Sequence, residues 1–469
     1  MASDDRGHRA ALATIAQGQI DERPRVVILG GGFAGLYAAK QLGRAPVRVT
    51  VVDRRNHHLF QPMLYQVATA ALNPSDIASP IRSILRGRKN TDVLLGEAAS
   101  VDVGTREVLL ADGVTLPYEY LLVATGARHS YFGHDEWEAL APGLKSIEDA
   151  VAIRTKVLLA FEEAEREIRP ERRQALLTFV VVGGGPTGVE LAGALAEIRN
   201  FALQRDFRQI NPRDATVMLI EAGPRILGTY PPELSERAVT SLRRLGVEVR
   251  TNTMVTNIGE WSVQAGEWTI PTRTVLWAAG NVASALLRSL GAPLDRQGRV
   301  IVNPDCTIPG HPEVFVLGDA AHFETEGELL PGVCPAAIQM GEYAARIIVQ
   351  EVTSRPGSPG ARPPFRYWDK GQLAVIGRGS AVADLGRLHF GGFFAWLAWI
   401  FVHIFFLIGF RNRLLVLIQW AYSYFTYRRG ARLITGEVGP GTPTRPLREL
   451  PTRPPEAAAA GTRERATSS

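Results

Sequence analysis

Two glycine-rich loops hold the residues whose types and spacing point most clearly to chemistry. Residues 30–35 and 183–188 both fit the pattern Gly-x-Gly-x-x-Gly, and each loop stands between a branched apolar run and a helical pattern. The first glycine permits a tight turn, the second lets a pyrophosphate approach the backbone, and the third lets the helix pack on the strand. The N-terminus of that helix presents free N–H groups to the phosphates. Two such sites in one chain predict hydride transfer between nucleotides, of which NAD(P)H and FAD are the usual pair.

An acidic residue ends the second strand of each of these units. Asp53 and Glu221 occupy the two positions, where a carboxylate can hold the ribose hydroxyls of an adenosine. Glu221 would also repel a 2′-phosphate, and Ala222 and Gly223 follow it in place of an arginine. The sequence therefore favours NADH over NADPH, although Arg225 keeps NADPH open.

The elements that must position these residues are those of an α/β fold. We expect two Rossmann-like dinucleotide-binding domains and a C-terminal apolar helical region for membrane attachment. Residues 121–126 and 275–280 are strands that end in glycine, and they predict the crossings between the two domains. The expected boundaries are a disordered N-terminus at 1–23, FAD-binding parts at 24–145 and 281–355, an NADH-binding domain at 146–280, a membrane-attachment region at 356–435 and a disordered tail at 436–469.

The composition excludes several kinds of site. Cys306 and Cys334 are the two cysteines of the chain, which rules out a disulfide framework, a four-cysteine zinc site and a Cys-x-x-Cys pair, and favours a reducing compartment. His57, His58 and His403 have no partners at metal-ligand spacing, so we expect no metal. The net charge of +5 comes without a basic cluster among aromatics, so we expect no nucleic acid. Residues 1–23 lack the apolar run of a secretory signal.

Two apolar, aromatic-rich runs near the C-terminus predict contact with a membrane. Residues 393–410 carry no charge, and residues 414–427 form a second run that arginines flank. As helices these runs would measure roughly 27 Å and 21 Å, whereas a crossing needs about 20 apolar residues. Trp, Phe and Tyr with flanking arginines suit helices that lie in the interface. We favour this monotopic attachment over spanning.

Longer motifs resemble one family of two-dinucleotide-domain flavoproteins, the type II NADH:quinone oxidoreductases. The resemblance runs from about residue 25 to 435 and rests on residues 56–68, 331–341 and 367–371, on the glycine-ended strands and on the Gly318-Asp319 pair. It implies non-covalent FAD with Asp319 on the ribitol, NADH as donor and a membrane quinone as acceptor. It also implies a homodimer. From the apolar runs we expect attachment at the cytoplasmic face of the cell membrane, and without a bundle of spanning helices or a membrane-buried acid we expect no proton pumping.

Three side chains are candidates for catalysis, and each has a structural alternative. Gln339 would bind a quinone carbonyl, or else pair with nearby backbone; Cys334 and Pro335 replace an Ala-Gln pair that many family members have there. Glu190 would handle charge or protons near the flavin, or else stabilise its helix dipole. Lys370 would stabilise reduced flavin or pair with Glu190, or else rest its stem on apolar surface.

The resemblance and the two loops together define the expected cofactor contacts. These are Gly30, Gly32, Phe33, Ala34, Gly35, Asp53, Arg54, Gln66, Ala124, Thr125, Gly126, Gly318, Asp319 and Ala337 on the FAD side, and Gly183, Gly185, Gly188, Glu221, Ala279 and Gly280 on the NADH side.

Several other functions remain as alternatives. A sulfide:quinone oxidoreductase should carry paired redox cysteines near the flavin, and glutathione or thioredoxin reductases need Cys-x-x-Cys. A ferredoxin reductase would not need the apolar C-terminus. A redox sensor would bind both nucleotides without turnover.

Of the histidines, we expect 57 and 58 in a loop near the flavin and 403 on the membrane face or in packing, and we expect Cys334 to be a small apolar filler.

Overall fold

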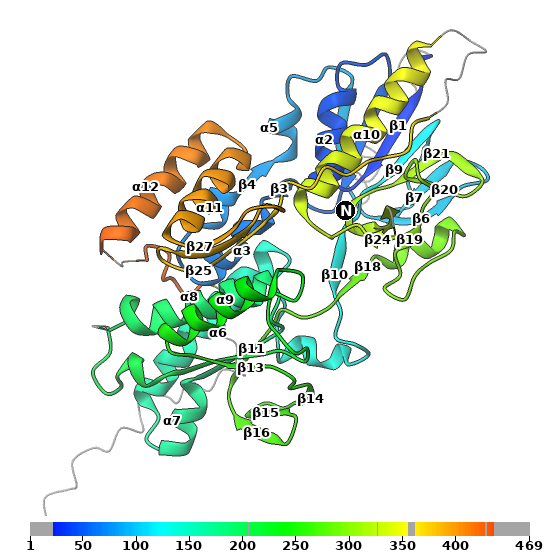
Figure 1. The fold of residues 1–469 in the computed structure, drawn as a ribbon. Helices are drawn as coiled ribbons and strands as arrows, with labels where there is room; N and C mark the ends of the chain where they lie inside the picture. Colours follow the sequence, from blue (N-terminus) through cyan, green and yellow to red (C-terminus); the bar gives the residue numbers. More distant parts are fainter. Residues whose placement is uncertain (1–21, 205, 326, 355–361, 427–428, 436–469) are drawn as a thin grey trace, which may run out of the picture.

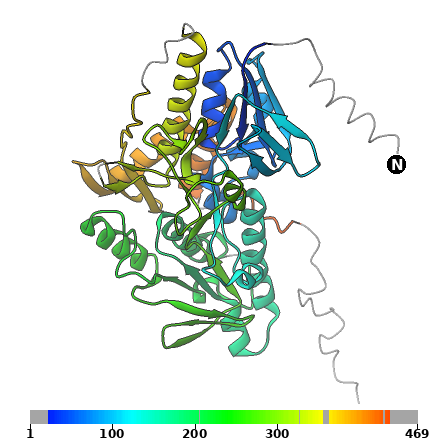
Figure 2. The same cartoon turned by 90° about the vertical axis from the view of Figure 1, so that its right-hand side faces the viewer.

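The computed structural model describes residues 22–204, 206–325, 327–354, 362–426 and 429–435. The termini expected to be disordered lie almost wholly outside these residues. Figures 1 and 2 show two α/β lobes, one holding the first glycine loop and the other the second.

Branched apolar runs form the sheet beneath the first loop. Parallel strands buried on both faces read as continuous hydrophobic runs, as the central strands here do. The strand order is β20-β21-β9-β1-β2-β5, and β1 pairs in parallel with both β9 and β2. The strands are β1 (Arg25–Leu29), β2 (Arg48–Asp53), β5 (Thr91–Leu95), β9 (Tyr120–Val123), β20 (Thr307–Ile308) and β21 (His311–Val316). Residues from two distant parts of the chain therefore share one sheet.

The second lobe repeats this arrangement with fewer strands. Its order is β13-β12-β11-β17, so β11 corresponds to β1, β12 to β2, β13 to β5 and β17 to β9. The strands are β11 (Thr178–Val182), β12 (Thr216–Ile220), β13 (Val247–Arg250) and β17 (Thr274–Trp277). In the part of the chain that the structure describes, nothing in this sheet corresponds to β21.

Two short strands join the lobes. β10 (Ala127–His129) follows the glycine that ends the first crossing, and β18 (Asn281–Ala283) follows the glycine that ends the second. They pair with each other antiparallel, as β10 and β18 in Figure 1 show. The predicted crossings are therefore neighbours in space.

Helix α10 (Cys334–Thr353) lies against α2 (Phe33–Leu42), the helix that follows the first loop. The approach is close, because a Cβ at Gly341 would lie 2.2 Å from the carbonyl oxygen of Ala34. This contact brings the start of α10 to the loop.

A C-terminal module of three strands and two helices packs on α8 (Pro186–Glu197). A Cβ at Gly193 of α8 would lie 1.7 Å from the carbonyl oxygen of Ile376, so strand and helix touch through their backbones. The module consists of β25 (Gln372–Gly377), β26 (Ser380–Asp384), β27 (His389–Gly392), α11 (Phe393–Phe406) and α12 (Phe410–Thr426).

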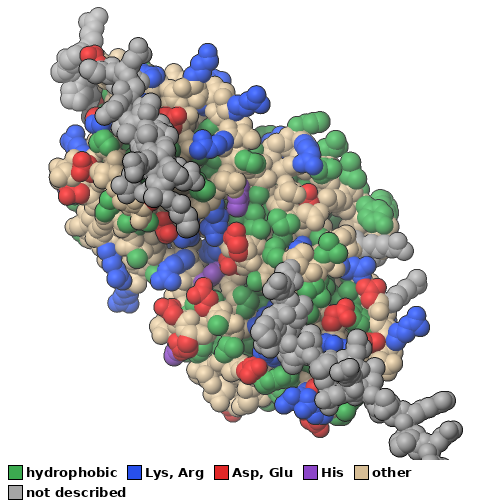
Figure 3. All heavy atoms as spheres, turned by 180° about the vertical axis from the view of Figure 1, so that it is seen from behind, with side chains coloured by type: hydrophobic (Ala, Val, Ile, Leu, Met, Phe, Trp, Pro, Cys, Tyr) green, Lys and Arg blue, Asp and Glu red, His purple; other side chains and the backbone are tan. Residues whose placement is uncertain are grey.

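Helices α11 and α12 form a hairpin with one buried and one exposed apolar face. Ala395, Trp399 and His403 of α11 are buried. Exposed apolar side chains gather on the other face: Phe394, Leu397, Phe401, Phe405, Phe410, Leu414, Leu417, Ile418 and Phe425. Figure 3 shows apolar side chains on the side where this hairpin lies. None of the helices in the described residues is both long and apolar enough to span a bilayer.

One arginine at the end of the hairpin differs from its expected place. We expected the arginines after the second run to flank a lipid surface, but Arg429 is buried, with 8% of its surface exposed. Its guanidinium donates to the carbonyl oxygens of Thr69 (2.6 Å) and Ala194 (3.2 Å) and pairs with Glu197 at 2.9 Å. A buried charge needs such partners, and they fasten the end of the hairpin to the body of the protein.

Candidate functional site

The first glycine loop has the geometry that a pyrophosphate requires. Gly30 has a φ of +106°, and a Cβ there would lie 2.3 Å from the carbonyl oxygen of Ala124. A Cβ at Gly35 would lie 1.9 Å from the carbonyl oxygen of Gly30. Gly32, by contrast, has nothing within 4 Å of its Cβ position and is exposed. The middle glycine thus leaves a cradle that a side chain would fill.

The second loop has nearly the same φ values and Cβ distances as the first. Gly183 also has a φ of +106°, and a Cβ at Gly188 would lie 1.8 Å from its carbonyl oxygen. Gly185 has nothing within 4 Å. Gly32 and Gly185 are the N-caps of α2 and α8, and neither helix start has a side-chain cap. The first N–H groups of α2, and those that follow Pro186 in α8, are therefore available to an anion.

The two acidic residues bind their loops in the same way. Asp53 accepts a hydrogen bond from the N–H of Gly31 at 2.6 Å, and Glu221 accepts one from the N–H of Gly184, also at 2.6 Å. Glu221 accepts a second, from the N–H of Gly223, at 2.6 Å. Each carboxylate is thus held at the edge of its cradle, where a ribose would lie.

Gly318 and Ala337 lie beside the residues that follow the first loop, since the Cβ position of Gly318 is 3.8 Å from the Cβ of Ala34. Gly318, with a φ of +64°, has a Cβ position 3.2 Å from the Cβ of Ala337, at the start of α10. Asp319 follows, close to Gly332. Thr125 has a buried hydroxyl with no hydrogen-bond partner among the described residues. This orphaned hydroxyl and the open cradle both fit a bound dinucleotide.

Other predicted contacts have roles within the protein itself. Phe33 packs edge-on against His58 (4.9 Å between ring centroids) and Phe60 (6.0 Å). Arg54 is exposed, and its Nη1 lies 3.9 Å from Oε1 of Glu97. Gly126 and Gly280 have φ values of +65° and +68° and introduce the paired crossings, with Ala279 before the second.

His57 and His58 lie in a short strand and not in the expected loop, and of the three histidines 58 and 403 are buried. His58 lies in β3 (His57–Leu59), and its Nδ1 is 3.0 Å from the carbonyl oxygen of Gly31. His403 stacks on Trp399 at 4.1 Å, so it is a packing residue. Burial lowers the pKa of both His58 and His403 to about 4.

Glu190 is a buried acid between α8 and the C-terminal module. Its carboxylate accepts a long hydrogen bond, 3.4 Å, from the N–H of Val375 in β25. Burial raises its pKa to about 8, more than that hydrogen bond lowers it. The carboxyl group is therefore protonated at neutral pH, which suits a group that handles protons.

Lys370 and Gln339 both contact Trp368. The ammonium of Lys370 is exposed and lies 5.4 Å from the ring centre of Trp368 and 5.6 Å from that of Phe406. Among the described residues, no ion pair joins it to Glu190. Gln339 binds the peptide group of Trp368 twice, donating at 2.9 Å and accepting at 3.0 Å. This is the backbone pairing that we considered as its structural alternative.

The sequence did not predict three residues that lie near Glu190 and Gln66. Tyr65 and Tyr230 are buried beside Glu190, which adds to the rise that burial causes in the pKa of each phenol. Trp420 donates its indole N–H to Gln66 at 2.7 Å. They come from separate segments with no shared spacing, so only the fold brings them together.

Both cysteines are free thiols. Cys306 is buried in the core, and Cys334 is half-buried at the start of α10. Burial raises the pKa of both, that of Cys334 to about 12, so neither is a ready thiolate.

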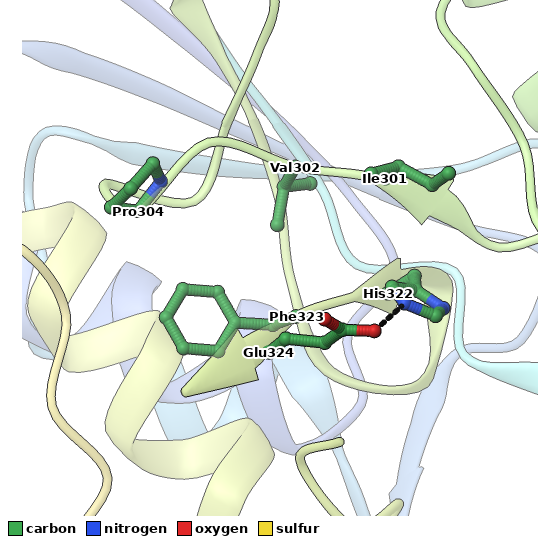
Figure 4. Close-up of a pocket in the computed structure, with 6 residues that line it drawn as sticks. All are labelled: Ile301, Val302, Pro304, His322, Phe323 and Glu324. Carbon is green, nitrogen blue, oxygen red and sulfur yellow. Dashed lines mark hydrogen bonds and ion pairs between the residues drawn. The ribbon is translucent and has the colours of Figure 1, made fainter. Parts of the chain in front are cut away.

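A cavity of about 280 Å³ lies apart from this set (Figure 4). It is lined by Ile301, Val302, Pro304, His322, Phe323 and Glu324. None of the residues predicted from the sequence lines it.

Comparison with known proteins shows the family of the chain. Residues 24–341 match the family model for pyridine nucleotide-disulphide oxidoreductases, and residues 369–429 match the model for the NDH2 C-terminal domain. The chain is 44% identical over 431 residues to the type II NADH:quinone oxidoreductase Ndh of Mycobacterium tuberculosis, which covers 89% of this chain and 92% of that protein. The chain belongs to the type II NADH:quinone oxidoreductases. It is also 44% identical to a second enzyme of that organism, NdhA, over 91% of this chain and 93% of that protein.

Solved structures share the fold. The structure of NDH2 from Plasmodium falciparum in complex with NADH matches with a TM-score of 0.79 at 19% identity, over 88% of this chain and 100% of that one. A sulfide:quinone oxidoreductase from Aquifex aeolicus matches less well, with a TM-score of 0.64 at 20% identity over 83% and 92%.

Membership of the type II NADH:quinone oxidoreductases settles the reaction. The enzyme is an FAD-dependent oxidoreductase that oxidises NADH and reduces a quinone without pumping protons. Enzymes of this family are membrane-associated.

Proposed function

We propose that the first loop holds FAD, that the second holds NADH, and that the hairpin α11–α12 rests on the lipid surface from which the quinone enters. The single observation that carries this assignment is the pair of open cradles, each with a carboxylate 2.6 Å from a loop N–H. The first cradle takes FAD because Gly318, Asp319 and Ala337 converge on it. The second has no such partner in the described residues.

In this proposal the residues of the chain bind and orient, while the bound flavin supplies the capacity to accept a hydride and pass on two electrons. The N-termini of α2 and α8 bind the two pyrophosphates. Asp53 and Glu221 accept hydrogen bonds from ribose hydroxyls. Glu190, protonated at neutral pH, holds a proton in the buried space between α8 and β25. Quinone reduction consumes two protons, and Glu190 is placed to supply one.

The hairpin supports attachment to one face of the membrane. It leaves the body after β27 and returns to it at Arg429, so both of its ends lie on the same side. The exposed stripe on α11 consists of Phe394, Leu397, Phe401 and Phe405. A stripe of this kind suits burial to a shallow depth in the headgroup region. We place this face at the cytoplasmic side, in keeping with two free thiols.

Two matched variants test the attachment. Deleting residues from 393 onward would also remove the buried Trp399 and His403, so it confounds attachment with stability. We expect Phe401→Ser with Phe405→Ser to lose co-sedimentation with phosphatidylcholine vesicles while NADH oxidation by ferricyanide stays normal. Exposed Trp268, in the other lobe, provides the control, and Trp268→Ser should sediment with vesicles as wild type does. Retained sedimentation of the double variant would place the anchor elsewhere.

Two experiments test the assignment of FAD to the first loop: release of the flavin by acid, and a substitution in the loop. The absence of any expected attachment residue predicts that acid denaturation releases the flavin into the supernatant. Gly32→Val fills the open cradle without a clash, so we expect a folded protein that lacks flavin. Flavin that stays with the precipitate, or a Gly32→Val variant that keeps FAD, would contradict the proposal.

A further inference from the structure

A chain of hydrogen bonds joins the membrane-side hairpin to helix α3 (Leu64–Ala68), beside the proposed flavin pocket. Trp420 of α12 donates its indole N–H to Oε1 of Gln66 at 2.7 Å. Gln66 in turn donates from Nε2 to the hydroxyl of Tyr65 at 3.0 Å. Tyr65 and Gln66 are 7% and 6% exposed, so water does not compete with these bonds.

The chemistry of the three groups determines the direction of each bond. An indole nitrogen only donates, so it selects the carbonyl oxygen of the Gln66 amide and turns the NH₂ group toward Tyr65. A phenol has one O–H donor and two acceptor positions. Because Gln66 takes an acceptor position, the O–H of Tyr65 is left to donate in another direction.

The phenol lies beside the buried acid, Glu190. Helix α3 packs against α8, which carries Glu190. Among the described residues, no acceptor is bonded to the O–H of Tyr65. Gln339, the donor that the sequence offered for a quinone, already binds the peptide of Trp368 with both its oxygen and its nitrogen. The phenol of Tyr65 is therefore a neutral donor with no acceptor among the described residues, next to the buried acid.

We propose that Tyr65 donates its hydrogen bond to a carbonyl oxygen of the quinone, and that Trp420 is the positioning residue that keeps Tyr65 free to do so. The proposal rests on the proposed function, which brings the quinone to this side of the flavin. Without the indole N–H, the Gln66 amide can turn over and present its oxygen to Tyr65. The phenol would then donate to Gln66 and be lost to the quinone.

Trp420→Phe isolates this effect, because it removes the N–H and keeps an aromatic ring against Trp399, which lies 5.2 Å away. The matched control is Trp396→Phe. Trp396 is on the same hairpin, and its ring packs at a tilt against those of Phe393 and Tyr424. Both variants should sediment with vesicles as wild type does.

The experiment measures the two half-reactions with a short-chain ubiquinone as acceptor. We expect Trp420→Phe to lower quinone turnover about three- to tenfold, the effect of one hydrogen bond. Flavin bleaching by NADH in rapid mixing and turnover with ferricyanide should keep their wild-type rates. Tyr65→Phe should lower quinone turnover at least as much, and the double variant should be no worse than Tyr65→Phe, because Trp420 acts through Tyr65.

Several results would overturn the inference. Independent, multiplying losses in the double variant would mean that Trp420 does not act through Tyr65. Unchanged quinone turnover in either single variant, or an equal loss in Trp396→Phe, would also refute it, as would slowed flavin bleaching. A wild-type enzyme that is bleached by NADH but reduces no quinone would instead count against the proposed function.

Discussion

Replacing Gln339 by leucine removes two hydrogen bonds at once and leaves most of the side-chain volume in place. The amide now holds the peptide group of Trp368 at 2.9 Å and 3.0 Å. A hydrogen bond contributes about 0.5–1.5 kcal/mol, so residues 368–371 would lose about 1–3 kcal/mol of anchoring. Gln339 is half-buried, and water reaching the freed peptide keeps the loss toward the lower value. This segment carries Lys370, and it lies next to the start of α10.

We therefore expect Gln339→Leu to raise the quinone KM or lower quinone turnover several-fold. Flavin bleaching by NADH and turnover with ferricyanide should keep their wild-type rates, because the second loop is untouched. Gln350→Leu, on an exposed face near the far end of α10, is the control and should change neither. Equal losses in both half-reactions would mean that the flavin itself is disturbed. Full quinone turnover would show that neither Gln339 nor the segment it anchors contributes to the acceptor site.

Three further predictions concern single side chains. Glu221→Gln should lower the ratio of kcat/KM for NADH to kcat/KM for NADPH about 10- to 100-fold, where each factor of ten corresponds to about 1.4 kcal/mol. An unchanged ratio in steady-state assays would assign the preference to another residue. Quinone turnover should fall as pH rises through about 8, where Glu190 loses its proton, and Glu190→Gln should abolish that limb of the pH profile. Because its pKa is raised in the folded state, wild type should also lose stability between pH 4.5 and about 8 relative to Glu190→Gln, as urea unfolding would show. Arg429→Met should cost about 1–3 kcal/mol of unfolding free energy, because the carbonyl oxygens of Thr69 and Ala194 lose their donor and half-buried Glu197 loses its cation. Adding Glu197→Gln should recover part of this loss, and a loss below about 1 kcal/mol would contradict the ion pair seen here.

The loops and their strands could be predicted because their signals are local. A turn at Gly30 with a positive φ, a closely packed Gly35 and an acid at the end of the next strand all lie within one βαβ unit, where a single geometry satisfies them. The same holds for Gly183 and Glu221. The two apolar runs also predicted two helices near the C-terminus, although α11 ends at Phe406 and α12 begins at Phe410.

The contacts of the catalytic candidates could not be predicted, because they join distant segments. An arginine at the end of an apolar run suggests lipid headgroups, and nothing near Arg429 in the sequence points to Glu197, 232 residues away. Gln339 meets Trp368 in the same way, through the packing of a later segment on α10. The link from Trp420 through Gln66 to Tyr65 likewise depends on where the C-terminal module docks.

The missing counterpart of β21 has a consequence for how long each nucleotide stays bound. The two loops have nearly identical geometry, so they should bind the phosphates and ribose of the two nucleotides about equally tightly. FAD, however, must stay bound through many turnovers, whereas NAD must dissociate after each one. The difference in dissociation rate therefore arises outside the loops. In the first lobe, β21 delivers Gly318 and Asp319 to the far end of the cradle, and α10 closes beside them. The second sheet ends at β17, so among the described residues it brings no counterpart of Gly318 and Asp319 to the second loop.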